Sequence, residues 1–339
     1  MREPAFWWRE TGAAARLLAP VAALYGAVAA ARLKQRGRRA AAPVVCIGNP
    51  TVGGAGKTPT ALAVARMLAA AGERPAFLSR GYGGELGGPL AVDPARHRAA
   101  EVGDEPLLLA RAAPTVVARA RVAGARLAIA AGASVIVMDD GFQNPSLAKD
   151  FSVLVVDARR GIGNRKVIPA GPLRAPLRVQ LERSDALVVV GAAPGAADVA
   201  ADARARKLPV FEARLQPDAG FIAALGGGRV LAFAGIGDPE KFFATLAAAG
   251  VAVAATRSFP DHHRYSAAEA QALCDDADGE GLVLVTTEKD LARLSGEAAM
   301  AELAARATAL PVTLAFDDEP SFARLMLDRI AAARRTVDS

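Results

Sequence analysis

Hydrophobic residues follow two different periods along this chain. From residue 43 onward, short and nearly continuous apolar runs alternate with stretches whose apolar residues recur every three or four positions. The runs predict buried strands, and the other stretches predict amphipathic helices, such as one over 60–71. Buried strands separated by helices are typical of a parallel sheet that helices cover on both faces. The strands expected here are 44–48, 76–79, 115–118, 135–138, 152–156 and 186–190.

The alternation is interrupted between residues 215 and 228. Gln216-Pro217-Asp218 and the triple glycine at 226–228 are typical of turns and linkers. A second set of strands is expected after them, at 230–234, 251–255 and 282–286. We therefore expect a larger α/β domain over 41–220, a smaller α/β domain over 221–310, and a C-terminal strand and helix over 311–339 that could pack back on the larger domain.

The segment 1–40 differs in character from the rest. Trp7 and Trp8 precede an apolar, alanine-rich run over 17–33, and a basic cluster occupies 34–39. The run is shorter than the roughly 20 apolar residues with which a helix spans a bilayer. It predicts a helix at the membrane surface, with the tryptophans at the level of the lipid headgroups and the basic cluster facing anionic lipid. A secretory signal peptide and a buried alanine-rich helix are the alternatives, and use of cytosolic ATP would exclude the first of them.

Composition narrows the class of protein. Of the 339 residues, 52% are hydrophobic and 22% are charged, so the chain can bury enough apolar surface to fold. Two cysteines and three histidines make a disulfide framework or a histidine-rich zinc site improbable, and they suit a reducing compartment. The net charge of +6 favours anionic substrates or surfaces. The basic residues are dispersed, however, so we expect no nucleic-acid partner.

A glycine-rich loop follows the first expected strand. The segment 53–58 reads Gly-Gly-Ala-Gly-Lys-Thr and lies between a strand and a helix, which is the context of a phosphate-binding loop. In such loops, backbone N–H groups surround phosphate oxygens, the lysine reaches the β- and γ-phosphates and the hydroxyl ligates Mg²⁺. We therefore expect ATP and Mg²⁺ to bind at Thr51, Gly53, Gly54, Ala55, Gly56, Lys57 and Thr58.

This loop departs from the strict pattern G-x-x-x-x-G-K-[ST], because Thr51 stands where the first glycine would be. An ordinary glycine turn is the alternative. The strand before the loop and the helix after it favour the compact phosphate-binding variant.

A pair of acidic residues ends another apolar strand. The run 135–138 leads directly into Asp139 and Asp140. A carboxylate at the end of a buried strand can hold Mg²⁺ opposite a phosphate-binding loop, so we expect these two residues to contribute to a metal site. Asp157, after the strand 152–156, is the alternative, although a lone Asp at such a place is more typical of a turn.

Further short motifs follow in order up to about residue 290. They are Ser79-Arg80-Gly81-Tyr82-Gly83, Val102-Gly103-Asp104-Glu105-Pro106, Asp139-Asp140-Gly141-Phe142-Gln143, Pro169-Ala170-Gly171-Pro172-Leu173-Arg174, Gly235-Ile236-Gly237, Phe259-Pro260-Asp261-His262-His263 and Thr287-Glu288-Lys289-Asp290. Together with Gly48-Asn49 and the phosphate loop, this ordered set resembles the tetraacyldisaccharide 4'-kinases, the lipid A 4'-kinases of Gram-negative bacteria.

The resemblance implies a P-loop kinase fold and a defined reaction. The γ-phosphoryl group of ATP would pass to the 4'-hydroxyl of a tetraacylated glucosamine disaccharide 1-phosphate, in lipopolysaccharide biosynthesis. The enzyme would work on a lipid surface, at the cytoplasmic face of the inner membrane. Asn144 is a departure, because we expect His after Gly-Phe-Gln, and it puts a minor contact in doubt.

The resemblance also assigns catalytic roles. Asp104 matches the family's catalytic carboxylate, which acts as general base toward the sugar hydroxyl, and His262 matches a histidine that assists it. Because His262 lies in the smaller domain, the site would form by closure between the domains. For Asp104 the alternative is a cap on the helix expected near Pro106, and for His262 the competitor is the adjacent His263.

Four other residues lie in glycine-flanked loops or at a strand end. We expect them to contact phosphates of ATP or of the acceptor substrate. They are Arg80, Gln143, Arg174 and Lys289.

A function of another class is a nucleotide-switched P-loop regulator or chaperone, which would hydrolyse ATP or GTP to change conformation. The expected membrane-facing helix and the motifs around Asp104 and His262 disfavour it, because a switch would need none of them.

Overall fold

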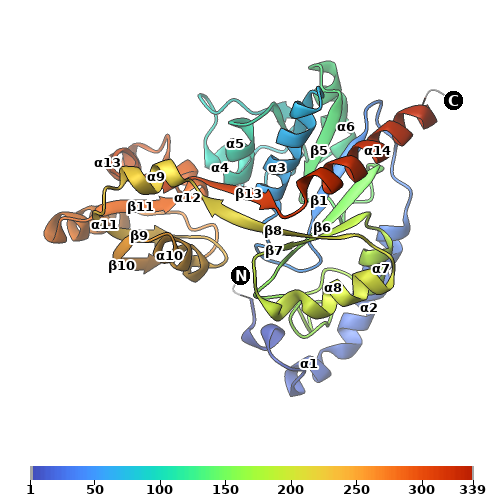
Figure 1. Ribbon diagram of the computed structural model, residues 1–339, viewed down its shortest axis with the longest axis horizontal. Helices are drawn as coiled ribbons and strands as arrows, with labels where there is room; N and C mark the ends of the chain where they lie inside the picture. Colours follow the sequence, from blue (N-terminus) through green and yellow to red (C-terminus); the bar gives the residue numbers. More distant parts are fainter. Residues whose placement is uncertain (1–2, 338–339) are drawn as a thin grey trace.

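A nine-stranded sheet forms the centre of the larger of two lobes. The computed structural model describes residues 3–337, and the two lobes lie side by side in it (Figure 1). The strand order is β13-β8-β7-β6-β1-β5-β2-β4-β3. All neighbours are parallel except β13 with β8 and β3 with β4. The strands are β1 Val44–Gly48, β2 Pro75–Ser79, β3 Leu90–Ala91, β4 Thr115–Val117, β5 Val135–Asp139, β6 Phe151–Asp157, β7 Ala186–Val190, β8 Val210–Pro217 and β13 Val312–Phe316.

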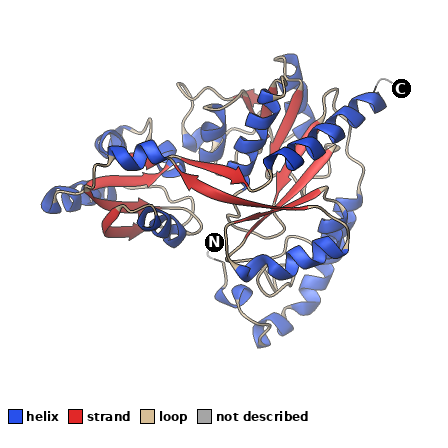
Figure 2. Ribbon diagram, in the orientation of Figure 1, coloured by secondary structure: helices blue, strands red, loops and turns tan. Residues whose placement is uncertain are grey.

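Helices cover both faces of this sheet (Figure 2). Leu68, Leu109 and Phe322 belong to the apolar cluster on one face, and Ala125, Leu181 and Ala203 belong to the cluster on the other. Because both faces are dry, the central strands are apolar at nearly every position, which is the pattern that predicted them. The expected α/β class with a mostly parallel sheet is confirmed. The covering helices are α3 Lys57–Ala70, α5 Asp104–Ala110 and α14 Glu319–Val337 on the first face, and α6 Arg121–Ala130, α7 Leu177–Glu182 and α8 Ala197–Ala205 on the second.

The smaller lobe is built on a separate sheet of four parallel strands, in the order β10-β9-β11-β12. Most of its buried apolar residues form clusters of their own, and Ala292 of α12 joins Val102, Leu107 and Val117 of the larger lobe in a cluster between the lobes. Its strands are β9 Arg229–Ala234, β10 Ala252–Ser258, β11 Val283–Thr287 and β12 Thr308–Leu310. Its helices are α9 Ala219–Ala224, α10 Pro239–Ala248, α11 Ala267–Glu280, α12 Glu288–Leu294 and α13 Ala301–Arg306.

Two antiparallel strands connect the lobes. β8 leads into the smaller lobe and β13 leads back, with Val312 paired to Pro217 and Phe316 paired to Ala213. The chain thus crosses between the lobes beside the domain borders expected at 220/221 and 310/311. β8 itself is missing from the strands that the sequence predicts, because its residues alternate between partly buried and exposed and form no continuous apolar run.

The N-terminal segment lies against the larger lobe. It contains α1 Ala13–Leu17 and α2 Ala19–Lys34, after a short 3-10 turn at Ala5–Trp8. Within residues 3–337 we find no helix with the length and hydrophobicity needed to cross a membrane.

The two tryptophans are placed differently from the sequence-based expectation. The indole N–H of Trp7 donates to the carbonyl of Pro169 at 2.9 Å, and that of Trp8 donates to Glu3 Oε2 at 3.0 Å. The guanidinium of Arg160 covers the ring of Trp8 at 4.5 Å. Because both polar edges are bonded within the protein, the tryptophans pack on the larger lobe and are not directed to lipid headgroups.

Candidate active site

The glycine-rich loop joins the end of β1 to the beginning of α3. Gly53 and Gly56 have φ values of 87° and 89°, in the left-handed region that favours glycine. The loop curls back over its own lysine, because Lys57 Nζ donates to Asn49 Oδ1 at 3.2 Å and to the carbonyl of Gly53 at 3.3 Å. Lys57 is buried, and its ammonium lies 3.9 Å from Asp140. The loop and the lysine therefore have the form of a phosphate-binding site.

Thr58 and Asp139 lie opposite each other where α3 begins and β5 ends. The Thr58 hydroxyl donates to Asp139 Oδ2 at 3.3 Å. The other oxygen, Asp139 Oδ1, is buried and has no hydrogen-bond partner among the described residues. Burial, together with the charges of Glu105 and Asp140, raises the pKa of Asp139 to about 7 against the opposing charge of Lys57. A hydroxyl and an orphaned carboxylate oxygen are ligands that suit Mg²⁺.

Asp140 has the opposite electrostatic character. Its carboxylate accepts two hydrogen bonds from Arg174, at 2.9 and 3.3 Å. Burial would raise its pKa, but the charges of Lys57 and Arg174 outweigh burial and hold the pKa below its ordinary value. Near neutral pH, Asp139 is therefore partly protonated, whereas the adjacent Asp140 is ionised.

Arg174 and Gln143 hold the backbone that leads into the phosphate loop. Arg174 Nε donates to the carbonyl of Thr51 at 2.8 Å, and Gln143 Nε2 donates to the carbonyl of Asn49 at 3.0 Å. Both side chains are predicted to contact phosphates, and in this structure both bond the backbone of the segment that leads into the phosphate loop.

A second cluster forms where α5 of the larger lobe meets the smaller lobe. Asp104 is buried, and its Oδ2 lies 3.4 Å from Nδ1 of His262, which follows β10. The same oxygen accepts hydrogen bonds from Nε and Nη2 of Arg293 on α12, the first at 2.7 Å. Burial would raise the pKa of Asp104, but the hydrogen bond with His262 and the charges of Arg293 and Lys289 hold it well below its usual range. The hydrogen bond with Asp104 in turn raises the pKa of His262.

The alternatives for these residues find other structural roles. α5 begins at Asp104 itself, and Asp104 Oδ1 accepts the backbone N–H of Glu105 at 2.9 Å in the first turn. The other oxygen, Oδ2, faces His262 and Arg293, so the carboxylate serves both the helix start and the cluster. His263 faces Glu269 within the smaller lobe at 3.1 Å and stacks on Phe259.

Asp157 also has a structural role. It accepts the backbone N–H groups of Arg159 and Arg160 and pairs with Lys241 of the smaller lobe. Its carboxylate is therefore a turn former and an interlobe contact.

Three further predicted positions lie around these clusters. Lys289 donates to Glu105 Oε1 at 2.6 Å and is thereby turned toward the larger lobe. Arg80 is exposed just after β2. Asn144 Oδ1 accepts from the backbone and hydroxyl of Ser146, so it closes a local turn.

Three further residues, which the sequence does not predict, contact the two clusters: Arg293, Asn49 and Tyr82. Asn49 holds Lys57, and the ring of Tyr82 lies 5.1 Å from that of His262. Asn49 and Tyr82 stand inside quoted motifs, which is a signal that could have found them. Arg293 stands outside them, and nothing in the sequence separates it from the other arginines.

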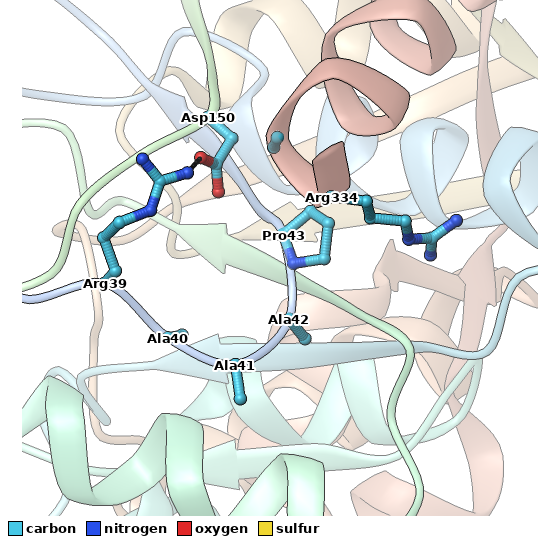
Figure 3. Close-up of a pocket in the computed structure, with 8 residues that line it drawn as sticks. Arg39, Ala40, Ala41, Ala42, Pro43, Asp150 and Arg334 are labelled. Atoms are coloured by element: carbon cyan, nitrogen blue, oxygen red, sulfur yellow. Dashed lines mark hydrogen bonds and ion pairs between the residues drawn. The ribbon is translucent and has the colours of Figure 1, made fainter. Parts of the chain in front are cut away.

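A cavity of about 190 Å³ lies away from both clusters (Figure 3). Its lining includes Pro43, which precedes β1, and Asp150, which precedes β6. It therefore lies at the amino ends of the parallel strands, whereas the phosphate loop follows a carboxyl end. Arg39 points to Asp150 across the cavity, and the guanidinium of Arg334 points away from it.

Comparison with known proteins agrees with this geometry. The model of the family described as tetraacyldisaccharide-1-P 4'-kinase (LpxK) matches residues 14–331. A tetraacyldisaccharide 4'-kinase from Rhodopseudomonas palustris (strain BisA53) is 59% identical over 98% of this chain and 97% of its own length. One from Nitrobacter winogradskyi is 57% identical over 99% of each chain.

A solved structure shares the fold. It is an "apo" form of LpxK from Aquifex aeolicus in complex with ATP, with a TM-score of 0.71 and 27% identity, covering 93% of this chain and 99% of that one. With the family model matching almost the whole chain and relatives well above half identical, this chain belongs to the tetraacyldisaccharide 4'-kinase family.

Proposed function

We propose that this chain carries out the reaction for which its family is named. It transfers the γ-phosphoryl group of ATP to the 4'-hydroxyl of a tetraacylated glucosamine disaccharide 1-phosphate, in the biosynthesis of lipid A. The observation that carries the proposal is the meeting of two clusters: a phosphate loop with Lys57 buried in it, and a carboxylate and histidine brought together from different lobes. The charge of Lys289 lowers the pKa of Asp104 and also that of Asp139, which supports one site that contains both clusters.

The phosphate loop would hold the triphosphate of ATP. The backbone N–H groups of Gly53, Gly54, Ala55 and Gly56 and the beginning of α3 supply positive potential. Lys57 would exchange its bonds to Asn49 and the Gly53 carbonyl for phosphate oxygens of similar reach. Thr51 would act through its carbonyl, which orients Arg174.

Thr58, Asp139 and Asp140 fit a magnesium site. The fit rests on the orphaned Asp139 Oδ1 and on the Thr58 hydroxyl, since Mg²⁺ in nucleotide sites takes few protein oxygens and fills its shell with phosphate and water. Mg²⁺ bound there would neutralise charge that develops on the phosphates. Asp140, ionised and held by Arg174, would contribute through its charge or through a bound water.

Asp104 would act as general base toward the sugar hydroxyl. Its low pKa keeps it ionised, so it is ready to accept the hydroxyl proton as the phosphoryl group moves. A proton on such a stabilised carboxylate is short-lived, and His262 lies close enough to receive it or to share it. The remaining predicted contacts, Arg80 and Lys289, would attract the anionic parts of the two substrates.

The acceptor is a lipid, and the N-terminal helices present a surface suited to it. Leu17, Val21, Leu24, Tyr25 and Val28 are large apolar side chains exposed on α1 and α2. Basic residues flank this surface. We propose that it rests on the lipid at the cytoplasmic face of the inner membrane, where ATP is available and the acceptor can enter from the bilayer.

The test is phosphate transfer from radiolabelled ATP to a tetraacyldisaccharide 1-phosphate in mixed micelles with Mg²⁺. Wild-type protein is expected to label the lipid. Asp104→Asn is expected to bind ATP normally but to lose transfer by about 10²–10⁴-fold, the usual share of a general base. Lys57→Ala is expected to lose transfer and to weaken ATP binding, and Lys166→Ala, which removes an exposed lysine, serves as control. ATP hydrolysis without lipid labelling would instead support the nucleotide-switched regulator.

A further inference from the structure

Arg293 is the residue of the smaller lobe that makes the closest contacts with the proposed base. It lies on α12, and its side chain is only 8% exposed. Nε donates to Asp104 Oδ2 at 2.7 Å, and Nη2 reaches the same oxygen. The guanidinium therefore fixes a carboxylate that belongs to the other lobe, with the directionality of a charge-assisted pair.

The guanidinium is itself held rigidly. Nη1 donates to Asp290 Oδ1 at 2.8 Å, and Asp290 is fully buried. Asp290 in turn accepts hydrogen bonds from the Tyr265 hydroxyl at 3.0 Å, from the Thr287 hydroxyl at 2.7 Å and from the backbone N–H of Gly235. Because these bonds fix Asp290, and Asp290 fixes the guanidinium, Arg293 loses little conformational freedom when it binds Asp104. Arg293 is thus preorganised to receive that carboxylate.

The same guanidinium also reaches the segment that carries the histidine. Nη1 donates to the carbonyl of Gly235 at 2.6 Å, and this carbonyl accepts the backbone N–H of His262 at 3.1 Å. His262 has a φ of 56°, an uncommon conformation for a residue other than glycine, so its backbone needs such support.

We propose that Arg293 is the positioning residue of the Asp104–His262 pair, aligning the carboxylate and the imidazole across the interface between the lobes. The inference rests on the proposed role of Asp104 as base. Separation of the lobes would withdraw Arg293 and His262 from Asp104 together, so the base would be correctly oriented only in the closed form. This arrangement would link proton acceptance to exclusion of water from the site.

The charged groups around Asp104 determine what loss of Arg293 would do. Lys289 and Arg293 face it from α12, His262 from the loop after β10, and Glu105 lies beside it on α5, already paired with Lys289. Tyr265 and Asp290 also face Arg293, and its substitution would remove the positive charge beside both of them. Without Arg293, Asp104 remains buried with less positive charge near it, so its pKa rises and it becomes protonated at a higher pH.

The experiment compares Arg293→Met, Arg293→Lys and a control, Arg306→Met, which removes ion pairs on the far side of the same lobe. For each folded variant, kcat and KM for ATP and for lipid are measured from pH 5.5 to 9. Arg293→Met is expected to lose kcat on the order of 10²-fold, as a misplaced catalytic group does. Its KM for ATP should stay within about threefold, and the acidic limb of its kcat profile should move to higher pH. Arg293→Lys should restore part of kcat, and the control should behave as wild type.

Several outcomes would overturn the proposal. One is wild-type kcat in Arg293→Met. Another is a loss of equal size at every pH, or a loss confined to KM, which would mark a purely structural contact. If Arg293→Met does not fold, a pH profile of Arg293→Lys that coincides with that of the wild type decides against the proposal as well. Asp104→Asn distinguishes the two proposals. Full activity in that variant would refute the role of Asp104 as general base, and not only the role of Arg293 in positioning it.

Discussion

Asp139 and Asp140 are neighbours in the chain with opposite electrostatic surroundings. Asp139 ends β5 in a dry site among other carboxylates, and its pKa is raised to about 7. Asp140 adopts a φ of 51° and turns toward Lys57 and Arg174, which lower its pKa. In the proposed metal and phosphate site, these two identical residues would therefore have different roles: Asp139 would bind the ion in competition with a proton, and Asp140 would supply a fixed charge.

The raised pKa of Asp139 predicts a pH-dependent effect on stability. The folded-state pKa lies above the ordinary value of about 3.9, because the folded protein favours the protonated carboxyl. The free energy of unfolding is therefore highest at acid pH, falls as the pH rises above about 4, and reaches its lower level above about 7. Asp139→Asn removes this loss. In the absence of Mg²⁺ it should raise Tm by a few degrees at pH 8.5 and by much less at pH 5, measured by differential scanning fluorimetry.

Asp140→Asn is the matched control, and it carries the opposite sign. The pKa of Asp140 is lowered, so its charge stabilises the fold at pH 8.5, and the substitution should lower Tm there. Asp140→Asn should lower Tm at pH 5 as well, because both pH values lie above the pKa of Asp140. A Tm of Asp139→Asn that shifts equally at both pH values, or a shift in the same direction for both variants at pH 8.5, would contradict the assigned surroundings.

At the scale of elements, the N-terminal helices bury small residues against the larger lobe and expose large apolar residues to solvent. Ala15, Ala22 and Gly26 are buried, and a side chain at Gly26 would meet Pro176 at 3.6 Å. The opposite side exposes the apolar surface formed by Leu17, Val21, Leu24, Tyr25 and Val28, with Leu17 at 82% and Leu24 at 70%. A contiguous apolar surface of this kind on a folded protein is typical of an interaction site, and the neighbouring cations favour an anionic lipid surface.

Leu17→Ser combined with Leu24→Ser should therefore weaken membrane binding while leaving the fold intact. Both side chains are exposed, so Tm should change little. Binding to vesicles that contain anionic lipid should fall by about a hundredfold or more, since each of the two buried leucines contributes roughly 1.5–3 kcal/mol. Co-flotation measures it.

The control for this pair is Leu86→Ser combined with Val283→Ser, which removes two exposed apolar side chains elsewhere on the molecule. It should float as wild type does. Equal flotation of both double variants would remove the helices from the membrane interface.

At the scale of the whole molecule, ion pairs close the two lobes on each other on both sides of the phosphate loop. Asp104 and Glu105 pair with Arg293 and Lys289. The end of β6 pairs with α10 through Asp157 and Lys241. Since each pair joins residues of different lobes, the closed form depends on them more than the folding of either lobe does.

Lys241→Met should loosen closure without unfolding a lobe. Breaking a partly buried interlobe pair lowers the population of the closed form, so the apparent KM for ATP should rise by roughly 3–10-fold while kcat at saturating substrate changes little. Steady-state kinetics and small-angle scattering provide the measurements. Arg229→Met, which breaks an exposed pair within the smaller lobe, should leave KM unchanged, and a similar rise in both variants would exclude closure as the cause.

The sequence by itself determined the class of fold and the chemistry of the phosphate loop. Continuous apolar strands and the order of strand, glycine loop and helix are local patterns, so they are recognisable along the chain before it is known which elements pack together. Motif order was specific enough to predict the family. β8 was missed, because most of its residues are partly buried or exposed and form no continuous apolar run.

The tertiary structure decided which side chains act together. It assigned His262 and not His263 to Asp104, turned Arg174 and Gln143 to the phosphate loop, and brought in Arg293 from far along the chain. The reason is physical: hydrogen bonds and ion pairs depend on distances between atoms of different elements, which the packing of the two lobes sets. The sequence gives the identity of each side chain, and only the packing of one lobe on the other brings Asp104, His262 and Arg293 into contact.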